Sequence, residues 1–356
     1  MSVPFPQENS LVSSSESVEI SKNMSVPEIT SILLHHGVRD VTHRLDLGRA
    51  PNYPVSGGLF SDTYRGVLSD GTPVAIKSLR HFIVSGNKQL KNLARELHTW
   101  SKLQHPNVLE LLGFALFRDR LSTVSPWMQN GTLPQYINFR PQVDRAGLCV
   151  QVAKGLAYLH ESGVVHGDLQ GSNIFVSGEG VPKLANLRRA ILNDPSLRFT
   201  GSNASGGSSL RWAAPELVNG VSVSMASDIY ALGMTFIEII TGELPYAGES
   251  DYTVITRLME KQHPERPEEL GRLGEKEADR LWSTMLNCWS FEPDMRPDAA
   301  GVVDVDGWLL KDLCMLRGAE SSIKGPRSND VGVYALIVMF LWESIIAFAA
   351  PKTMYD

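Results

Sequence analysis

The segment that most constrains this chain is the polar, glycine-containing stretch from His166 to Asn173, which separates two apolar runs at residues 155–165 and 174–176. Asp168 stands five residues before Asn173 in this loop. Its carboxylate can accept a proton from a hydroxyl group, and the amide oxygen of Asn173 can ligate a metal ion. A simple turn closed by an Asx hydrogen bond is the alternative interpretation. The choice depends on partner residues elsewhere in the chain.

Upstream, the pattern changes to strands from Tyr53 onward. An Asp70-Gly71 turn separates two apolar-rich runs, the second of which is Val-Ala-Ile-Lys ending at Lys77, and this arrangement predicts a β-hairpin. An ammonium on a rigid strand supplies a fixed positive charge that suits phosphate groups. The alternative is that Lys77 only closes an amphipathic strand.

A helix is expected from Leu90 to Leu103, because apolar residues recur at helical spacing through this segment. Glu96 lies on that helix, nineteen residues after Lys77. It can pair with the strand lysine or remain solvated, so its role follows from that of Lys77. A further helix is expected from Cys149 to His160, leading into the polar loop, and a short hairpin is expected after it.

The composition places the chain among globular proteins with a sizeable core, since 43% of its 356 residues are hydrophobic and 20% are charged. A net charge of −6 gives no basic footprint for nucleic acid. Three scattered cysteines without a CxxC pair indicate reduced thiols and a cytoplasmic location. No charged region followed by an apolar run begins the chain, so no secretory signal is expected.

The two ends differ from the middle. Residues 1–24 are rich in Ser, Glu, Asn and Pro and are predicted to be a disordered tail. Residues 25–50 are predicted to hold a helix and a linker, with Ser25 as the cap and Gly37 as the stop. A linker is expected at residues 312–330 and an apolar helix at residues 331–350.

The apolar segment 331–350 has about the length that spans a bilayer, although Glu343 interrupts it. Its ten Val, Leu, Ile and Phe residues each favour insertion by about 0.3 to 0.6 kcal/mol, whereas an acidic residue opposes it by about 2.5 to 3.5 kcal/mol. The balance favours insertion only marginally. A membrane anchor and a helix docked on the preceding domain both fit this pattern.

These features together resemble the protein kinases, most closely the tyrosine-kinase-like group, over about residues 51–311. The resemblance rests on the order and spacing of the lysine strand, the helix glutamate, the polar loop and three later features: Lys77, Glu96, Asp168, Asn173, the Ala-Pro-Glu motif ending at Glu216, Asp228 and Arg296. It implies an α+β, two-lobed protein kinase fold. The β-rich N-lobe would occupy residues 51–128 and the α-helical C-lobe residues 129–311, with ATP between them.

The resemblance also assigns roles. Lys77 and Glu96 would position the phosphates of ATP, and Asp168 would accept the proton of the substrate hydroxyl. Asn173 and Asn186 would hold Mg²⁺.

Nucleotide contacts are implied by the same resemblance. Gly57 and Gly58 would belong to the loop over the phosphates. Ser125 would be the gatekeeper, and the backbone of Pro126 and Met128 would bind adenine. Glu216 would pair with Arg296, and Asp228 would anchor the backbone of the catalytic loop.

The sequence departs from the family pattern at several of these positions. Asn186 replaces the aspartate that binds Mg²⁺, so a neutral amide stands where a carboxylate is expected. Ser56 and Ser61 replace two glycines of the phosphate loop, and Gln170 replaces a lysine. Arg188 replaces the glycine of the same triplet.

Three functions stay open on the sequence. The first is a signalling protein that binds ATP with weakened or lost phosphotransfer, as in pseudokinases. The second is an active Ser/Thr kinase. The third is an adaptor tethered to a membrane through residues 331–350. A protein substrate or a partner kinase is the expected partner.

Overall fold

The computed structural model describes residues 18–21, 23–49, 52–57, 61–80, 88–187, 191–192, 197–199 and 210–304. These residues all belong to one compact unit, Met1–Gly307. The second unit, Trp308–Asp356, contains the predicted linker 312–330 and the predicted apolar helix 331–350, and it lies outside the described residues. Within the described ranges, no helix combines the length and the hydropathy that crossing a membrane requires.

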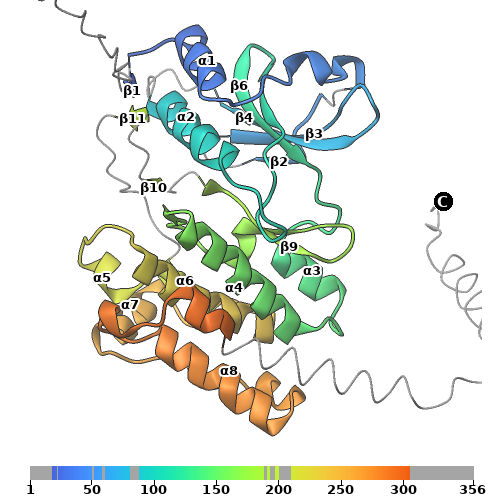
Figure 1. Ribbon diagram of the computed structural model, residues 1–356. Helices are drawn as coiled ribbons and strands as arrows, with labels where there is room; N and C mark the ends of the chain where they lie inside the picture. The colour runs from blue at the N-terminus through green and yellow to red at the C-terminus, as the bar shows by residue number, and fades with distance from the viewer. Residues whose placement is uncertain are drawn as a thin grey trace, which may run out of the picture. The chain divides into compact units, whose positions relative to one another are not determined.

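A five-stranded antiparallel sheet forms the first lobe, with the strand order β2-β3-β4-β6-β5 (Figure 1). Its strands are β2 (Ser56–Gly57), β3 (Ser61–Val67), β4 (Pro73–Leu79), β5 (Gly113–Phe117) and β6 (Arg120–Pro126). The predicted hairpin is confirmed as β3 and β4, and Gly71 takes a φ of +89° in the turn between them. Lys77 faces Thr63 in the register of this hairpin.

Two helices accompany the sheet, α1 (Val26–His35) and α2 (Lys88–Ser101). The predicted cap of α1 is confirmed, since the backbone N–H of Ser25 donates to Glu28 Oε2 over 2.7 Å. The segment after α1 is not a free linker, because short bridges join Asp40 to Phe114 and Leu45 to Leu68. A Cβ on Gly113 would collide with the carbonyl oxygen of Arg39, so glycine admits this segment against the edge of the sheet.

The prediction that residues 1–24 form a disordered tail was wrong for residues 18–20. Val18–Ile20 form strand β1, which pairs in parallel with β11 (Leu197–Phe199), and the side chain of Ile20 is fully buried. Three residues are too short to show a strand periodicity. Their partner also lies far along the chain, so no local pattern revealed it.

The second lobe is mainly helical, and Figure 1 shows α4, α6 and α8 together in it. Its helices are α3 (Leu133–Phe139), α4 (Arg145–Glu161), α5 (Pro215–Val218), α6 (Met225–Thr241), α7 (Asp251–Met259) and α8 (Glu275–Cys288). Short strands are β7 (Val164–Val165), β8 (Ile174–Val176), β9 (Pro182–Leu184) and β10 (Ile191–Leu192). Helix α6 is buried along most of its length, and Tyr230, Phe236 and Trp289 are completely buried. The two-lobed α+β architecture predicted from the sequence is thus confirmed.

A buried ion pair fastens α5 to the end of the second lobe. The guanidinium of Arg296 donates to both carboxylate oxygens of Glu216, over 2.7 and 2.8 Å, as predicted. It also donates to the carbonyl oxygens of Ser290 and Ala226. The side chain of Arg296 has no exposed area, so every donor must find its acceptor inside the protein.

We expect Arg296→Ala to lower the free energy of unfolding by about 3 to 5 kcal/mol, because the largely buried carboxylate of Glu216 would lose its partner. Chemical denaturation measures this value. Arg266→Ala is the matched control: Arg266 lies 2.7 Å from Asp279, but both side chains are largely exposed, so the expected loss is below about 1 kcal/mol. Equal losses in the two variants would contradict the prediction.

Candidate active site

The polar loop from His166 to Asn173 is held by one buried carboxylate. Asp228, in the first turn of α6, accepts the backbone N–H groups of His166 and Gly167 over 2.7 and 2.8 Å. Gly167 takes a φ of +75°, a conformation that glycine adopts without strain. His160, at the end of α4, also lies 3.1 Å from the Asp228 carboxylate. The predicted anchoring of the loop by Asp228 is confirmed.

The ring of His166 connects the loop to the segment after β9, which carries Asn186. Its Nδ1 accepts the backbone N–H of Asp168 over 3.2 Å, which leaves the proton on Nε2, 3.1 Å from the carbonyl oxygen of Ala185. The ring is fully buried, and this burial lowers the pKa of His166. A neutral imidazole with this tautomer therefore links the two segments.

Asp168 and Asn173 are side by side, as their spacing predicted. The Asn173 Nδ2 donates to the carbonyl oxygen of Asp168 over 2.7 Å and to its carboxylate Oδ2 over 3.1 Å. The amide of Gln170 lies 3.4 Å from the other carboxylate oxygen. The amide groups of Asn173 and Gln170 thus hold the Asp168 carboxylate in place. The bond from Asn173 to the carbonyl oxygen of Asp168 is a side-chain-to-backbone hydrogen bond within the turn.

Lys77 lies on β4 of the first lobe and contacts residues of both lobes. Its Nζ lies 3.4 Å from Glu96 Oε1 on α2 and donates to Asn186 Oδ1 over 2.7 Å. Glu96 is almost completely buried, whereas the Lys77 side chain is 27% exposed. The predicted lysine–glutamate pair is therefore formed, with α2 placed so that Glu96 faces the lysine.

Asn186 closes the network between the lobes. Its Nδ2 donates to Asn173 Oδ1 over 2.7 Å, while its Oδ1 accepts from Lys77. The residue has a φ of +62°, which asparagine tolerates better than most residues. A continuous chain of hydrogen bonds thus runs from Glu96 through Lys77, Asn186 and Asn173 to Asp168. The structure brings together all five residues that the sequence assigned to phosphates, proton transfer and metal.

The donor set around Asn186 does not fit Mg²⁺, which the family resemblance implied. This ion requires oxygen ligands, and carboxylates supply most of the attraction. Lys77 donates to the Oδ1 of Asn186, so the NH₂ group of Asn186 points to the Oδ1 of Asn173. A metal ion would need this Asn173 oxygen as a ligand. Reversing the amide would place NH₂ against the ammonium. Within the described ranges, no group of three or more His, Cys, Asp or Glu residues could hold a metal either.

Three of the predicted nucleotide-binding positions lie at the end of β6 and just after it. Ser125 and Pro126 end β6, Ser125 is buried, and Met128 packs against the core of the second lobe. The carbonyl oxygen of Met128 accepts the N–H of Gly131 over 3.2 Å and keeps a second lone pair.

Of the two predicted glycines, Gly58 lies outside the described residues. Gly57 ends β2, where a Cβ would meet the guanidinium of Arg80 at 2.5 Å. Arg80 is held there by Asp62, 2.6 Å away. Gly57 therefore makes room for this ion pair, which the sequence analysis did not foresee.

Glu238 was also missed from the sequence. It lies in α6, where its carboxylate accepts the N–H of Gly171 over 2.8 Å and the indole N–H of Trp212 over 3.2 Å. Burial raises the pKa of Glu238 to about 7, and the two hydrogen bonds oppose this rise. An acidic residue within the apolar run 236–240 was the available signal, because such a residue is rarely buried without polar partners.

Two packed lobes, a lysine–glutamate pair and an anchored Asp-Asn loop define the protein kinase class. The family described as protein tyrosine and serine/threonine kinase matches residues 52–305. The chain therefore belongs to the protein kinase family.

Three relatives illustrate the breadth of the match. Human tyrosine-protein kinase FRK is 28% identical over 268 residues, which cover 72% of this chain and 50% of FRK. Tyrosine-protein kinase Btk of Drosophila melanogaster is 30% identical over 68% of this chain and 30% of its own length. MAP3K epsilon protein kinase 1 of Arabidopsis thaliana is 30% identical over 69% of this chain and 18% of its own. The chain thus spans half or less of these relatives.

The raised pKa of Glu238 predicts a pH-dependent stability. The folded state binds the proton of Glu238 more tightly than the unfolded state does. The stabilisation from this proton is therefore fully present below about pH 4.5 and is lost as the pH rises through about 7. Relative to Glu238→Gln, the wild-type protein should lose on the order of 3 kcal/mol of unfolding free energy over this window. Urea denaturation at a series of pH values measures the difference. The exposed Glu275→Gln is the control, and parallel profiles for Glu238→Gln and wild type would contradict the prediction.

Proposed function

We propose that this chain is a signalling protein of the protein kinase fold that binds ATP between its lobes and has weak or absent phosphotransfer. The observation that carries the proposal is the orientation of Asn186, whose NH₂ group is directed to Asn173 by the lysine on its other side. Phosphoryl transfer depends on positioning and on neutralisation of the phosphate charge, which kinases obtain largely from metal ions. An amide in this position removes that contribution.

ATP binding is supported by the residues that remain. Lys77 is held by Glu96 and is partly exposed, so its ammonium is available to phosphate oxygens. The anchored loop keeps Asp168 in place. A protein partner, such as a second kinase whose activity it modulates, fits a domain that binds nucleotide without transferring phosphate efficiently.

An active Ser/Thr kinase of the tyrosine-kinase-like group is the second candidate. It is favoured by the intact Lys77–Glu96 pair and by Asp168. The wording Trp-Ala-Ala-Pro-Glu at residues 212–216 supports the group assignment. Membrane attachment through residues 331–350 is a separate proposal, and identical fractionation of the full chain and a 1–325 truncation would remove it.

We expect ATP to raise the Tm of the wild-type protein by the same amount with Mg²⁺ and with EDTA, because the Asn186 amide offers no metal ligand. In Asn186→Asp the carboxylate can accept from Lys77 and face a metal with its other oxygen, so the shift should become larger with Mg²⁺ than with EDTA. Thermal unfolding measures both shifts. A wild-type shift that requires Mg²⁺ would contradict the prediction, and no shift in either condition would remove the nucleotide-binding proposal.

Phosphate transfer from ATP to a generic protein substrate should be at least tenfold faster in Asn186→Asp than in wild type, since a metal site restores charge neutralisation. The double variant Asn186→Asp with Asp168→Ala should return to background, which excludes a contaminating kinase. Radiolabelled ATP with Mg²⁺ or Mn²⁺ measures the rates. Wild-type transfer that Asp168→Ala abolishes, at a rate matching Asn186→Asp, would favour the active kinase.

A further inference from the structure

A separate apolar cluster joins the start of the chain to α2. We name the segment of residues 18–38, without residue 22, the N-terminal clamp. Four of its side chains are buried against two residues of the sheet and three of α2: Ile20, Ile29, Leu33 and Val38 pack with Leu93, Ala94, Leu97, Phe114 and Leu121. The clamp lies outside the kinase family match, which begins at residue 52. The clamp is therefore not part of the matched kinase domain.

The clamp contacts the helix that carries Glu96. Leu93 and Leu97 are four residues apart, so they lie on one face of α2 and enter the cluster together. Each residue advances about 100° around a helix, which places Glu96 on the neighbouring face toward Lys77. Helix α2 cannot turn Glu96 away from Lys77 without withdrawing these two leucines from the cluster.

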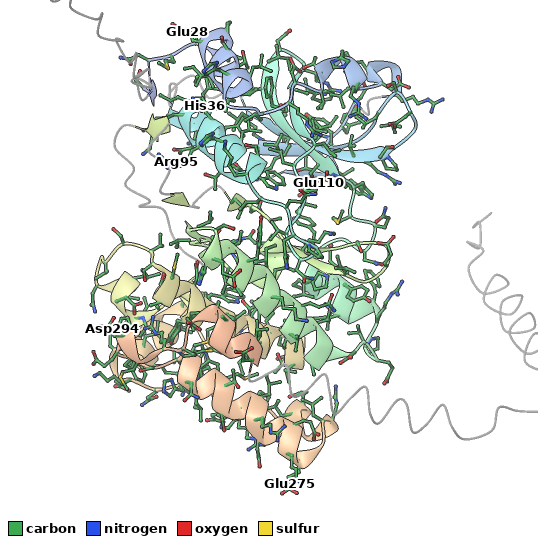
Figure 2. All side chains as sticks on the ribbon, in the orientation of Figure 1. Glu28, His36, Arg95, Glu110, Glu275 and Asp294 are labelled. Atoms are coloured by element: carbon green, nitrogen blue, oxygen red, sulfur yellow. The ribbon has the colours of Figure 1, made fainter. Side chains whose placement is uncertain are left out.

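A contact between two rings extends the same interface. The ring of His36, directly after α1, lies edge-on to the ring of His98 on α2, with centroids 5.4 Å apart. Figure 2 shows His36 at the end of α1 beside α2. The clamp thus contacts α2 beyond its apolar face.

The clamp also pairs with the segment between Asn186 and the Ala-Pro-Glu motif. Backbone pairing in β1 and β11 joins Val18 to Leu197 and Ile20 to Phe199. The side chain of Ile20 belongs to the same buried cluster as Leu97. One short segment therefore contacts both α2 and β11.

We propose that the N-terminal clamp is a positioning element that holds Glu96 against Lys77 and fixes β11. When the clamp is released, Glu96 no longer holds Lys77 in position for phosphate groups. Ile29 and Leu33 act through α2 and do not touch the site themselves. The buried cluster stabilises the inward position of α2 in the way that a bound regulatory partner would, but within one chain.

Hydrogen–deuterium exchange tests the clamp without any ligand. The full-length double variant Ile29→Ala with Leu33→Ala should exchange the amides of α2 at least tenfold faster than wild type, while those of α6 stay unchanged. Leu34→Ala is the matched control, because Leu34 lies on the same helix and is 50% exposed. Unchanged exchange in α2, or equal acceleration in α2 and α6, would overturn the proposal.

A second variant covers the strand. A chain that begins at Asn23 lacks β1 but keeps α1, and its amides at residues 197–199 should exchange at least tenfold faster than in the full chain. Unchanged exchange there would overturn the role of β1.

The link to Glu96 is tested by ATP affinity, and this part rests on the proposed function. We expect Glu96→Ala and the Ile29/Leu33 double variant each to weaken ATP binding about tenfold, and the combination to weaken it no further, because both act through one contact. Multiplied effects in the combination would overturn the positioning role. If wild type binds no ATP, the proposed function fails, and the exchange experiment still decides the clamp.

Discussion

The ammonium of Lys77 is the constraint on which the arrangement of the site depends. An ammonium has donors and no acceptor, so it faces the carboxylate of Glu96 on α2 and the Oδ1 of Asn186 in the second lobe, not an NH₂ group. An amide has two unlike ends, and fixing its oxygen fixes the direction of its NH₂ group. One positive charge therefore determines what the oxygen of Asn173 faces.

Because of this dependence, asparagine at residue 186 differs from aspartate by more than one unit of charge. A carboxylate has two equivalent oxygens and can face an ammonium and a metal ion at once. The amide of Asn186 can face only one of them with oxygen. The substitution thus converts a position for a cation into a hydrogen-bond donor that bridges the two lobes.

The predicted features were those in which neighbours in the sequence are neighbours in space, or in which the family order supplied the partner. Asp168 and Asn173 lie in one loop, and the β3–β4 hairpin closes through a short turn, so both were predictable. The direction of the Asn186 amide depends on Lys77, 109 residues away, and no residue pattern encodes it. The same holds for β1 and for Glu238, whose partners Gly171 and Trp212 come from other segments.

The contacts that hold the backbone of the loop and the second lobe do not depend on a carboxylate at residue 186. Asp228 holds the loop backbone, His166 joins it to Ala185, and Arg296 with Glu216 fastens the second lobe. None of these contacts needs a carboxylate at residue 186, so the fold tolerates asparagine there. The N-terminal clamp likewise packs on a face of α2 next to the one that carries Glu96. The proposed function therefore needs no rearrangement of the fold, because Glu96 holds Lys77 and Asp228 holds the loop without a carboxylate at residue 186.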